Sequence, residues 1–293
     1  MKTIDTLIPD IQTLVKTRGW LNDTNAQSFA TGVVSRIQGQ FSERTEAPRL
    51  RLSQMGPRCP KALWHSIHQP ENAEVLPHWA EVKYSLGHLT EALAIEFARG
   101  AGHEVTGEQD ELTLDDIVGH RDCIIDGCTV DVKSAASISF TKFKSGVFDD
   151  LFGYLDQLDS YVLAAADDPL VKVKDKGYLL IVDKQLGHMH LYPHEVTNDR
   201  ERVLRERIRS YKYIVSLAEP PPCECRSIPA GAAGNMQLDT KASYSSYKYC
   251  CHPHLRTFLY AHGPAYFTKV VKRPFNQNGP ITEVDRNGKV VYN

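Results

Sequence analysis

Apolar residues recur with two different periods along the chain, and these periods divide it into predicted helices and strands. Apolar positions at helical spacing cover residues 1–40, 85–100 and 147–166. Between the last two segments, 117–134 is rich in β-branched residues and is interrupted by Asp126-Gly127, a two-residue hairpin signal. The pattern therefore predicts a β-hairpin placed between two helices.

The second half of the chain continues the alternation of strands and helices. Strands are predicted at 178–183 and 188–192, and an arginine-rich helix at 197–217 is ended by three prolines. The tail from residue 267 alternates around a turn at 285–288. This order predicts one α/β core, with a mixed central sheet flanked by helices and a helical N-terminal appendage.

Composition changes this picture little. The 293 residues have ordinary apolar and charged fractions and a formal net charge of −2, so no global basic field indicates a nucleic-acid partner. There is no apolar run of bilayer length, and the N-terminus lacks the features of a signal peptide, which predicts a cytoplasmic protein. Seven cysteines, an odd count, favour free thiols or metal ligands over a disulfide framework.

A local basic patch on the surface could still bind a nucleic acid. Residues 41–80 are polar, contain several prolines, and interleave cations with aromatic residues. Such a mixture suits a surface that follows a nucleic-acid backbone and stacks on its bases, although an ordinary solvated loop has the same composition. The cations are Arg49, Arg51, Arg58 and Lys61, and the aromatic residues are Trp64, His65 and Trp79.

The predicted hairpin carries the main candidate chemistry. Asp131 and Lys133 lie two residues apart on one strand and share a face, and Asp122 lies near the start of the partner strand. Two carboxylates and an ammonium that converge in this way usually serve a metal ion or a titrating group. The plain alternative is the exposed polar face of an edge hairpin.

The two flanking helices add further polar side chains. Glu91 follows Gly87 by four residues, and Gln157 precedes Tyr161 by four, so each pair shares a helix face. Taken alone, Glu91 reads as a surface glutamate. The second pair reads equally well as a helix face packed on the sheet.

Together these pieces resemble the PD-(D/E)XK nuclease superfamily, and within it the RecB-like branch, which includes AddB-type nuclease domains, CRISPR-associated RecB-like nucleases and phage exonucleases. The resemblance covers about residues 85–165, with a weaker match over 49–64 and 235–253. It rests on four short motifs in this order along the chain: Gly87-x-x-x-Glu91, Gly119-x-x-Asp122, Asp131-x-Lys133 and Gln157-x-x-x-Tyr161.

The resemblance implies a metal-dependent phosphodiesterase. Asp122 and Asp131 would be the principal ligands of Mg²⁺ or Mn²⁺, with Glu91 and the backbone carbonyl of Val132 completing the set. Lys133 would orient or deprotonate the attacking water. Burial and the metal would lower its pKa, whereas the two aspartates would raise it.

The resemblance also implies roles outside the metal ligands. Gln157 and Tyr161 would position the lysine or contact the DNA strand, and the cations of 41–80 would contact DNA. The expected divisions are 1–80 as a helical N-terminal region with a DNA-guiding loop, 81–220 as the nuclease core, and 221–293 as a C-terminal clasp with a hairpin tail.

Many RecB-branch nucleases carry a four-cysteine iron–sulfur cluster, and this chain departs from that pattern. The segment around Cys59 resembles its first part and the segment ending at Cys251 its second, but Ala242 and Ser245 stand where two cysteines belong. Because such a cluster needs four thiolates, none is expected, and packing alone would bring Cys59 near Cys251. Cys223 and Cys225 could in principle replace the missing ligands, but their spacing does not match the cluster pattern. The spacing Cys223-x-Cys225 is also too tight for common zinc motifs, so structural zinc is not expected either.

The function predicted from this resemblance is a metal-dependent DNA exonuclease that acts on the ends of linear duplex or single strands. The setting would be phage-type replication or recombination, with a recombinase, a single-strand-binding protein or a helicase as partner. Three alternatives stay open: a non-catalytic DNA-binding scaffold that retains the nuclease fold, a structure-specific endonuclease, and an RNA nuclease.

Overall fold

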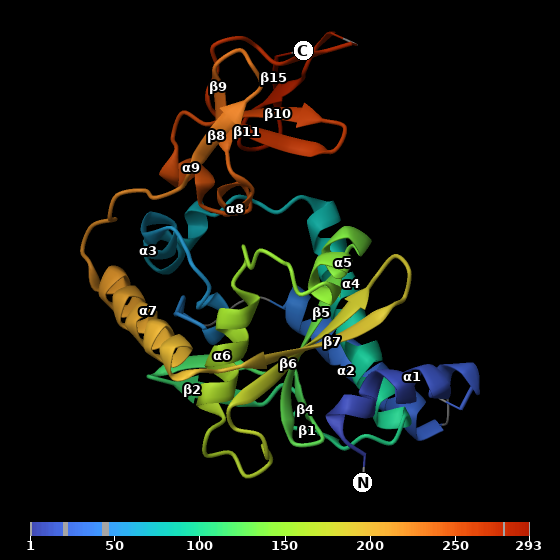
Figure 1. Ribbon diagram of the computed structural model, residues 1–293. Coiled ribbons are helices and arrows are strands. Elements are labelled where there is room, and N and C mark those ends of the chain that lie inside the picture. The colour runs from blue at the N-terminus through green and yellow to red at the C-terminus, as the bar shows by residue number, and fades with distance from the viewer. Residues whose placement is uncertain (1, 20–22, 43–46, 278, 293) are drawn as a thin grey trace. The chain divides into compact units, whose positions relative to one another are not determined.

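The computed structural model describes residues 2–19, 23–42, 47–277 and 279–292 (Figure 1). It divides into two compact units that do not follow the chain in order. The first unit comprises Met1–Gly56 and Pro77–Ile208, and the second comprises Pro57–Leu76 and Arg209–Asn293. The predicted divisions after residues 80 and 220 stay a prediction, and residues 43–46 of the predicted DNA-guiding loop lie outside the described ranges.

A five-stranded mixed sheet forms the centre of the first unit (Figure 1). Its order is β1-β4-β5-β6-β7, in which β5 and β6 are parallel and the other neighbours are antiparallel. The predicted α/β fold with a mixed central sheet is therefore confirmed. The strands are β1 (Val105–Thr106), β4 (Cys123–Ile125), β5 (Cys128–Ala135), β6 (Lys176–Asp183) and β7 (Met189–Glu195).

Helices pack on both faces of this sheet. On one face, Val130 and Val132 of β5 pack against α4 and α1, whereas on the other Leu179 and Ile181 of β6 pack against α6 and α5. Because side chains alternate along a strand, neighbouring residues of β5 and of β6 point to opposite faces of the sheet. The helices of this unit are α1 (Leu7–Lys16), α2 (Asp23–Phe41), α4 (His78–Gly100), α5 (Ser137–Lys144), α6 (Tyr154–Ala164) and the first part of α7 (Asn198–Ser216), with 3₁₀ turns η1 (Ile4–Thr6) and η2 (Leu52–Gln54).

The predicted turn between β4 and β5 is confirmed. Ile125 pairs with Cys128 across it, and both turn residues, Asp126 and Gly127, have positive φ, at 52° and 81°. Glycine and aspartate tolerate this left-handed conformation, which matches the twist of the two strands. The hairpin thereby sets the register of the candidate residues on β5.

The prediction of one continuous strand over 117–125 is wrong. It is two strands in different sheets, because β3 (Ile117–His120) pairs with β2 (Glu111–Leu114), whereas β4 pairs with β1 and β5. Arg121 interrupts the strand: its side chain is buried, donates to the Gly107 carbonyl over 3.1 Å, and forms an ion pair of 2.6 Å with Asp168. Asp122 therefore lies in the gap before β4 rather than on it.

The predicted helix over 147–166 begins later than expected. α6 starts at Tyr154, after Gly153 with φ of +72°. The Asp150 carboxylate accepts hydrogen bonds from the backbone amides of Tyr154 at 2.7 Å and Leu155 at 2.9 Å, which satisfies two donors that have no partner inside the helix. The apolar residues of 147–153 belong to the turn before the helix.

The second unit has its own sheet, which the sequence patterns did not predict. Six antiparallel strands run in the order β15-β14-β10-β11-β9-β8, around a small core of Phe258, Phe267 and Ile281. The predicted tail hairpin is confirmed as β14 and β15. The elements are α3 (Pro60–His68), η3 (Pro70–Asn72), the end of α7, β8 (Ser227–Ala230), β9 (Asn235–Leu238), α8 (Thr240–Ser243), α9 (Lys248–Cys251), β10 (Arg256–Tyr260), β11 (Gly263–Lys269), β12 (Phe275–Asn276), β13 (Gly279–Pro280), β14 (Glu283–Val284) and β15 (Val290–Tyr292).

Four cysteines converge within the second unit. The Sγ atoms of Cys59 and Cys251 lie 3.7 Å apart, as expected from the sequence. Cys223 and Cys225 join them, and the four Sγ atoms all lie within 4.8 Å of one another. Cys223 and Cys225 therefore do lie beside Cys59 and Cys251, although their spacing in the sequence does not match the cluster pattern.

Among the described residues, none of the helices combines the length and the apolar character needed to cross a membrane.

Gly153 offers a test of the packing in the first unit. A Cβ atom built on Gly153 would lie 2.2 Å from the Cα of Gly56, whereas one built on Gly146, with a similar φ of +70°, would meet nothing within 4 Å. We expect Gly146→Ala to lower the free energy of unfolding by about 1 kcal/mol through backbone strain alone. Gly153→Ala should cost about 2 kcal/mol more because of the clash. Urea titration of both variants measures the difference, and equal losses would contradict the close approach.

Candidate active site

Asp131 and Lys133 of β5 face α6 and form the centre of the candidate site. Asp131 is fully buried, and its Oδ2 atom lies 2.7 Å from Nζ of Lys133. Gln157 of α6 joins the pair: its Oε1 accepts from Lys133 at 3.2 Å, and its Nε2 donates to Oδ1 of Asp131 at 3.2 Å and to the Tyr161 hydroxyl at 3.1 Å. The Tyr154 ring lies 5.2 Å from the ammonium. One helix and one strand thus bring these polar side chains together.

Asp122 reaches the same strand from just before the start of β4. Its Oδ2 atom accepts a hydrogen bond of 2.7 Å from the backbone amide of Val132. In an extended strand the amide and carbonyl of one residue point to the same side. The Val132 carbonyl therefore faces the same edge of β5 as its amide, past the pair of Cys123 with Val130, where β4 no longer covers that edge. The structure thus brings Asp122, Asp131 and the Val132 carbonyl to one end of the β4–β5 pair.

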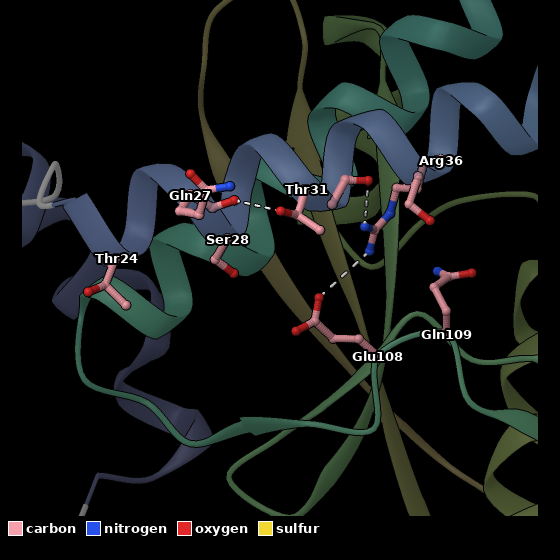
Figure 2. Close-up of a pocket in the computed structure, with 9 residues that line it drawn as sticks. Thr24, Gln27, Ser28, Thr31, Arg36, Glu108 and Gln109 are labelled. Carbon is pink, nitrogen blue, oxygen red and sulfur yellow. Dashed lines mark hydrogen bonds and ion pairs between the residues drawn. The ribbon is translucent and has the colours of Figure 1, made fainter.

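Glu91 comes from α4 and is held by two residues that the sequence patterns missed. Its Oε1 atom accepts hydrogen bonds of 2.8 Å from Nε of Arg36 and of 2.8 Å from Nε2 of Gln109. Arg36 lies on α2 above the segment that carries Glu108 and Gln109, as Figure 2 shows. No motif marks Arg36 or Gln109, because they lie 55 and 18 positions from Glu91 in the chain.

The three carboxylates act on one another electrostatically. Burial raises the pKa of Asp122 well above its usual value, and repulsion by Asp131 and Glu91 raises it further. Burial also raises the pKa of Asp131, more than its contact with Lys133 lowers it. For Glu91, burial is outweighed by its interactions with His88 and Arg36, so its pKa is lowered. The site therefore concentrates negative charge that the described residues compensate only in part.

The same two effects, burial and neighbouring charge, act on Lys133 with opposite signs. Burial lowers the pKa of its ammonium, but attraction to Asp131 and Asp122 is stronger, and the net effect raises the pKa. The sequence left this balance open. Without a bound metal, attraction to the two carboxylates therefore outweighs burial.

The donor atoms of this group fit a hard divalent cation. Carboxylate and carbonyl oxygens are the ligands that Mg²⁺ and Mn²⁺ prefer, and a cation would relieve the repulsion that raises the pKa of Asp122. The residues present therefore suit the metal that the motifs imply.

Gly119 and Gly87, the two glycines of the motifs, differ in their surroundings. A Cβ atom on Gly119 would lie 2.7 Å from Cβ of Leu52 and 3.1 Å from Cε1 of Tyr161, so the glycine lets the tyrosine ring pack against β3. A Cβ on Gly87 would meet nothing within 4 Å. Tyr161 is buried, which suits a role in holding Gln157 better than contact with DNA.

The cations predicted to contact DNA are divided between the units. Arg49 and Arg51 belong to the first unit and are exposed; Arg58, also exposed, and the half-buried Lys61 belong to the second. Their role in binding DNA stays a prediction.

Trp64, in contrast, does not serve as a base-stacking surface. It is 5% exposed, its indole N–H donates to the Leu217 carbonyl over 2.9 Å, and its ring stacks on His68. His65 is also buried, so these two aromatic residues anchor α3 within the second unit, whereas Trp79 is exposed.

Comparisons with known proteins give distant likenesses only. No family model and no curated protein matches the chain. Among solved structures, the "Crystal structure of SSO0001" is 15% identical, with 63% of this chain and 85% of that chain covered and a TM-score of 0.37. An alkaline exonuclease (LHK-Exo) from Laribacter hongkongensis is 12% identical, with 65% and 92% covered and a TM-score of 0.38. LHK-Exo in complex with dAMP is 11% identical, with 62% and 92% covered and a TM-score of 0.40. Likenesses this distant carry no argument about function, which therefore rests on the site.

The raised pKa of Asp122 leads to a stability prediction. A carboxyl whose pKa is higher in the folded than in the unfolded state stabilises the fold at low pH, and this contribution is lost as pH rises through the folded pKa. Asp122→Asn keeps an acceptor for the Val132 amide and removes the repulsion. Without metal at pH 8, we expect the variant to be more stable than wild type by about 0.5–2 kcal/mol. Mg²⁺ should stabilise the wild type and not the variant.

Thermal unfolding with Mg²⁺ or EDTA, at pH 5 and at pH 8, measures both effects. Asp167→Asn, which changes an exposed aspartate after α6, is the matched control and should behave as wild type. An Asp122→Asn variant less stable than wild type at pH 8 in EDTA would contradict the proposed repulsion.

Proposed function

We propose that this protein is a metal-dependent DNA exonuclease, which hydrolyses phosphodiester bonds from DNA ends. The observation that carries the proposal is the convergence of Glu91, Asp122, Asp131 and Lys133 at one end of the β4–β5 pair, with Gln157 joining the last two through hydrogen bonds. Burying like charges together is unfavourable, and a scaffold without chemistry has no need of it.

The carboxylates would hold the metal. Asp122, Asp131 and Glu91, with the Val132 carbonyl, would bind Mg²⁺ or Mn²⁺. When bound, such an ion polarises a phosphate oxygen and lowers the pKa of a water molecule. The chain's own contribution is to place these oxygens before substrate arrives, because Asp122 is tied to the Val132 amide and Glu91 to Arg36.

Lys133 would orient the attacking water and stabilise charge at phosphorus. Its contacts with Asp131 and Gln157 support this role, because they fix the ammonium beside the proposed metal ligands. Gln157 would hold the ammonium in position, and Tyr161 would in turn hold Gln157. These two are positioning residues rather than groups that touch the phosphate.

The finer parts of the proposal rest on the family resemblance. Three features follow from it: action on linear duplex or single-stranded ends, a place in phage-type replication or recombination, and a recombinase, single-strand-binding protein or helicase as partner. The proposed site itself does not distinguish end-directed from internal cleavage.

Cleavage of three labelled substrates tests the function directly. We expect end-labelled linear DNA, duplex or single-stranded, to be degraded with Mg²⁺ or Mn²⁺ and to stay intact in EDTA, and closed circular DNA to stay intact throughout. Products that shorten from one labelled end would also give the polarity. Nicking of the circle would indicate an endonuclease, degradation of matched RNA an RNA nuclease, and DNA binding without cleavage a scaffold.

Substitution of the lysine tests the proposed chemistry. Lys133→Ala should lower the cleavage rate by about 100-fold or more, the usual cost of losing a positioned group that acts on the transition state. Lys184→Ala, which removes an exposed lysine just after β6, should cleave as wild type does. Circular dichroism and thermal unfolding show whether each variant is folded. A folded Lys133→Ala variant with wild-type activity would refute the mechanism.

A further inference from the structure

The four cysteines of the second unit form a second cluster, which the proposed nuclease chemistry does not use. Cys59 precedes α3, Cys223 and Cys225 lie between α7 and β8, and Cys251 ends α9. None of the seven cysteines, all of which are described, forms a disulfide. Four thiols from three separate segments therefore meet at one point as free thiols.

The distances between the sulfur atoms indicate what they would hold. Cys59 Sγ lies 3.8 Å from Cys223 Sγ and 3.7 Å from Cys251 Sγ, and all four atoms lie within 4.8 Å of one another. Disulfide-bonded sulfurs would lie about 2 Å apart. Tetrahedral zinc with bonds of about 2.3 Å places neighbouring sulfurs about 3.8 Å apart. The separations of Cys59 Sγ from Cys223 Sγ and from Cys251 Sγ match the edges of such a tetrahedron.

An iron–sulfur cluster fits these distances poorly. In a four-iron cluster each thiolate binds a different iron atom, and in a two-iron cluster the thiolates are shared between two. Either arrangement spreads the sulfurs further apart than a single ion does. The cluster found in many RecB-branch nucleases therefore disagrees with the geometry of this chain, although the number of thiols would allow it.

The backbone supports the sulfur atoms as acceptors. The amide of Glu224 donates to Cys59 Sγ, and the amide of Cys225 donates to Cys223 Sγ, each over 3.3 Å. Amides aimed at sulfur stabilise the negative charge that thiolate ligands carry when they bind a metal. His252 lies close by, with Nε2 3.8 Å from Cys223 Sγ, but it does not belong to the group of mutually close ligand atoms.

We propose that Cys59, Cys223, Cys225 and Cys251 bind a single thiophilic ion, zinc, in a tetrahedral structural site. Zinc imposes no electronic preference on geometry and accepts four thiolates. Four protein ligands leave no position open for substrate, so the site is structural rather than catalytic. The ion would join parts of the second unit that lie 164 and 192 residues apart, where the apolar core is small.

Metal and sulfide analysis of the full-length protein tests this inference independently of nuclease activity. The protein is expressed with both zinc and iron in the medium and purified without oxygen, so that an oxygen-sensitive cluster would survive. We expect about one zinc per chain, no stoichiometric iron or acid-labile sulfide, and a colourless protein. Cobalt exchanged into the site should give the intense visible bands of tetrahedral tetrathiolate coordination. Iron with sulfide, or a metal-free protein whose four thiols react freely, would overturn the proposal.

Adjacent cysteines provide a matched pair of variants. Cys251→Ser should lower the zinc content to near zero, whereas Cys250→Ser changes a neighbouring cysteine outside the cluster and should keep about one zinc per chain. If Cys251→Ser does not fold, Cys225→Ser tests the same set, and the metal content and cobalt spectrum of the wild type decide without any variant. Full zinc content in folded Cys251→Ser and Cys225→Ser would refute the assignment.

Discussion

The burial of Asp131 between Asp122 and Lys133 is the constraint on which the first unit depends. A fully buried carboxylate is tolerated only when charge and hydrogen bonds compensate it, and here Lys133 and Gln157 supply both. Compensation stays incomplete because Glu91 and Asp122 add like charge nearby. The fold thus gives up some stability where its chemistry is proposed to occur, and a bound cation would restore it.

The surrounding structure explains how this arrangement persists. Layers of helix on both faces of the mixed sheet exclude water from Asp131, and the tight turn at Asp126-Gly127 prevents β5 from slipping relative to β4. A shift of one residue would turn Lys133 to the opposite face. Arg36, reaching from α2, gives the N-terminal helices a second role, because it holds Glu91 in addition to packing.

The second unit is built from two segments that lie far apart in the sequence. One cluster of its buried apolar residues comprises only Phe258, Phe267 and Ile281, and residues 77–208 of the first unit separate its two segments in the sequence. Long-range crosslinks offset the entropy of closing such loops. A metal held by the four cysteines would be one such crosslink, and it would explain why thiols from three segments meet.

The sequence by itself determined the elements whose signals are local. Helical periodicity, the two-residue turn and the alternation of β5 placed Asp131 and Lys133 on one face, and i,i+4 spacing paired Gln157 with Tyr161. Only the tertiary structure decided what depends on distant contacts. The buried ion pairs of Arg121 split the predicted strand, Arg36 joined Glu91, and Cys223 and Cys225 joined Cys59 and Cys251. The spacing pattern of the sequence placed Cys59 with Cys251, but it did not match the segment that carries Cys223 and Cys225, which only the folded chain brings to them.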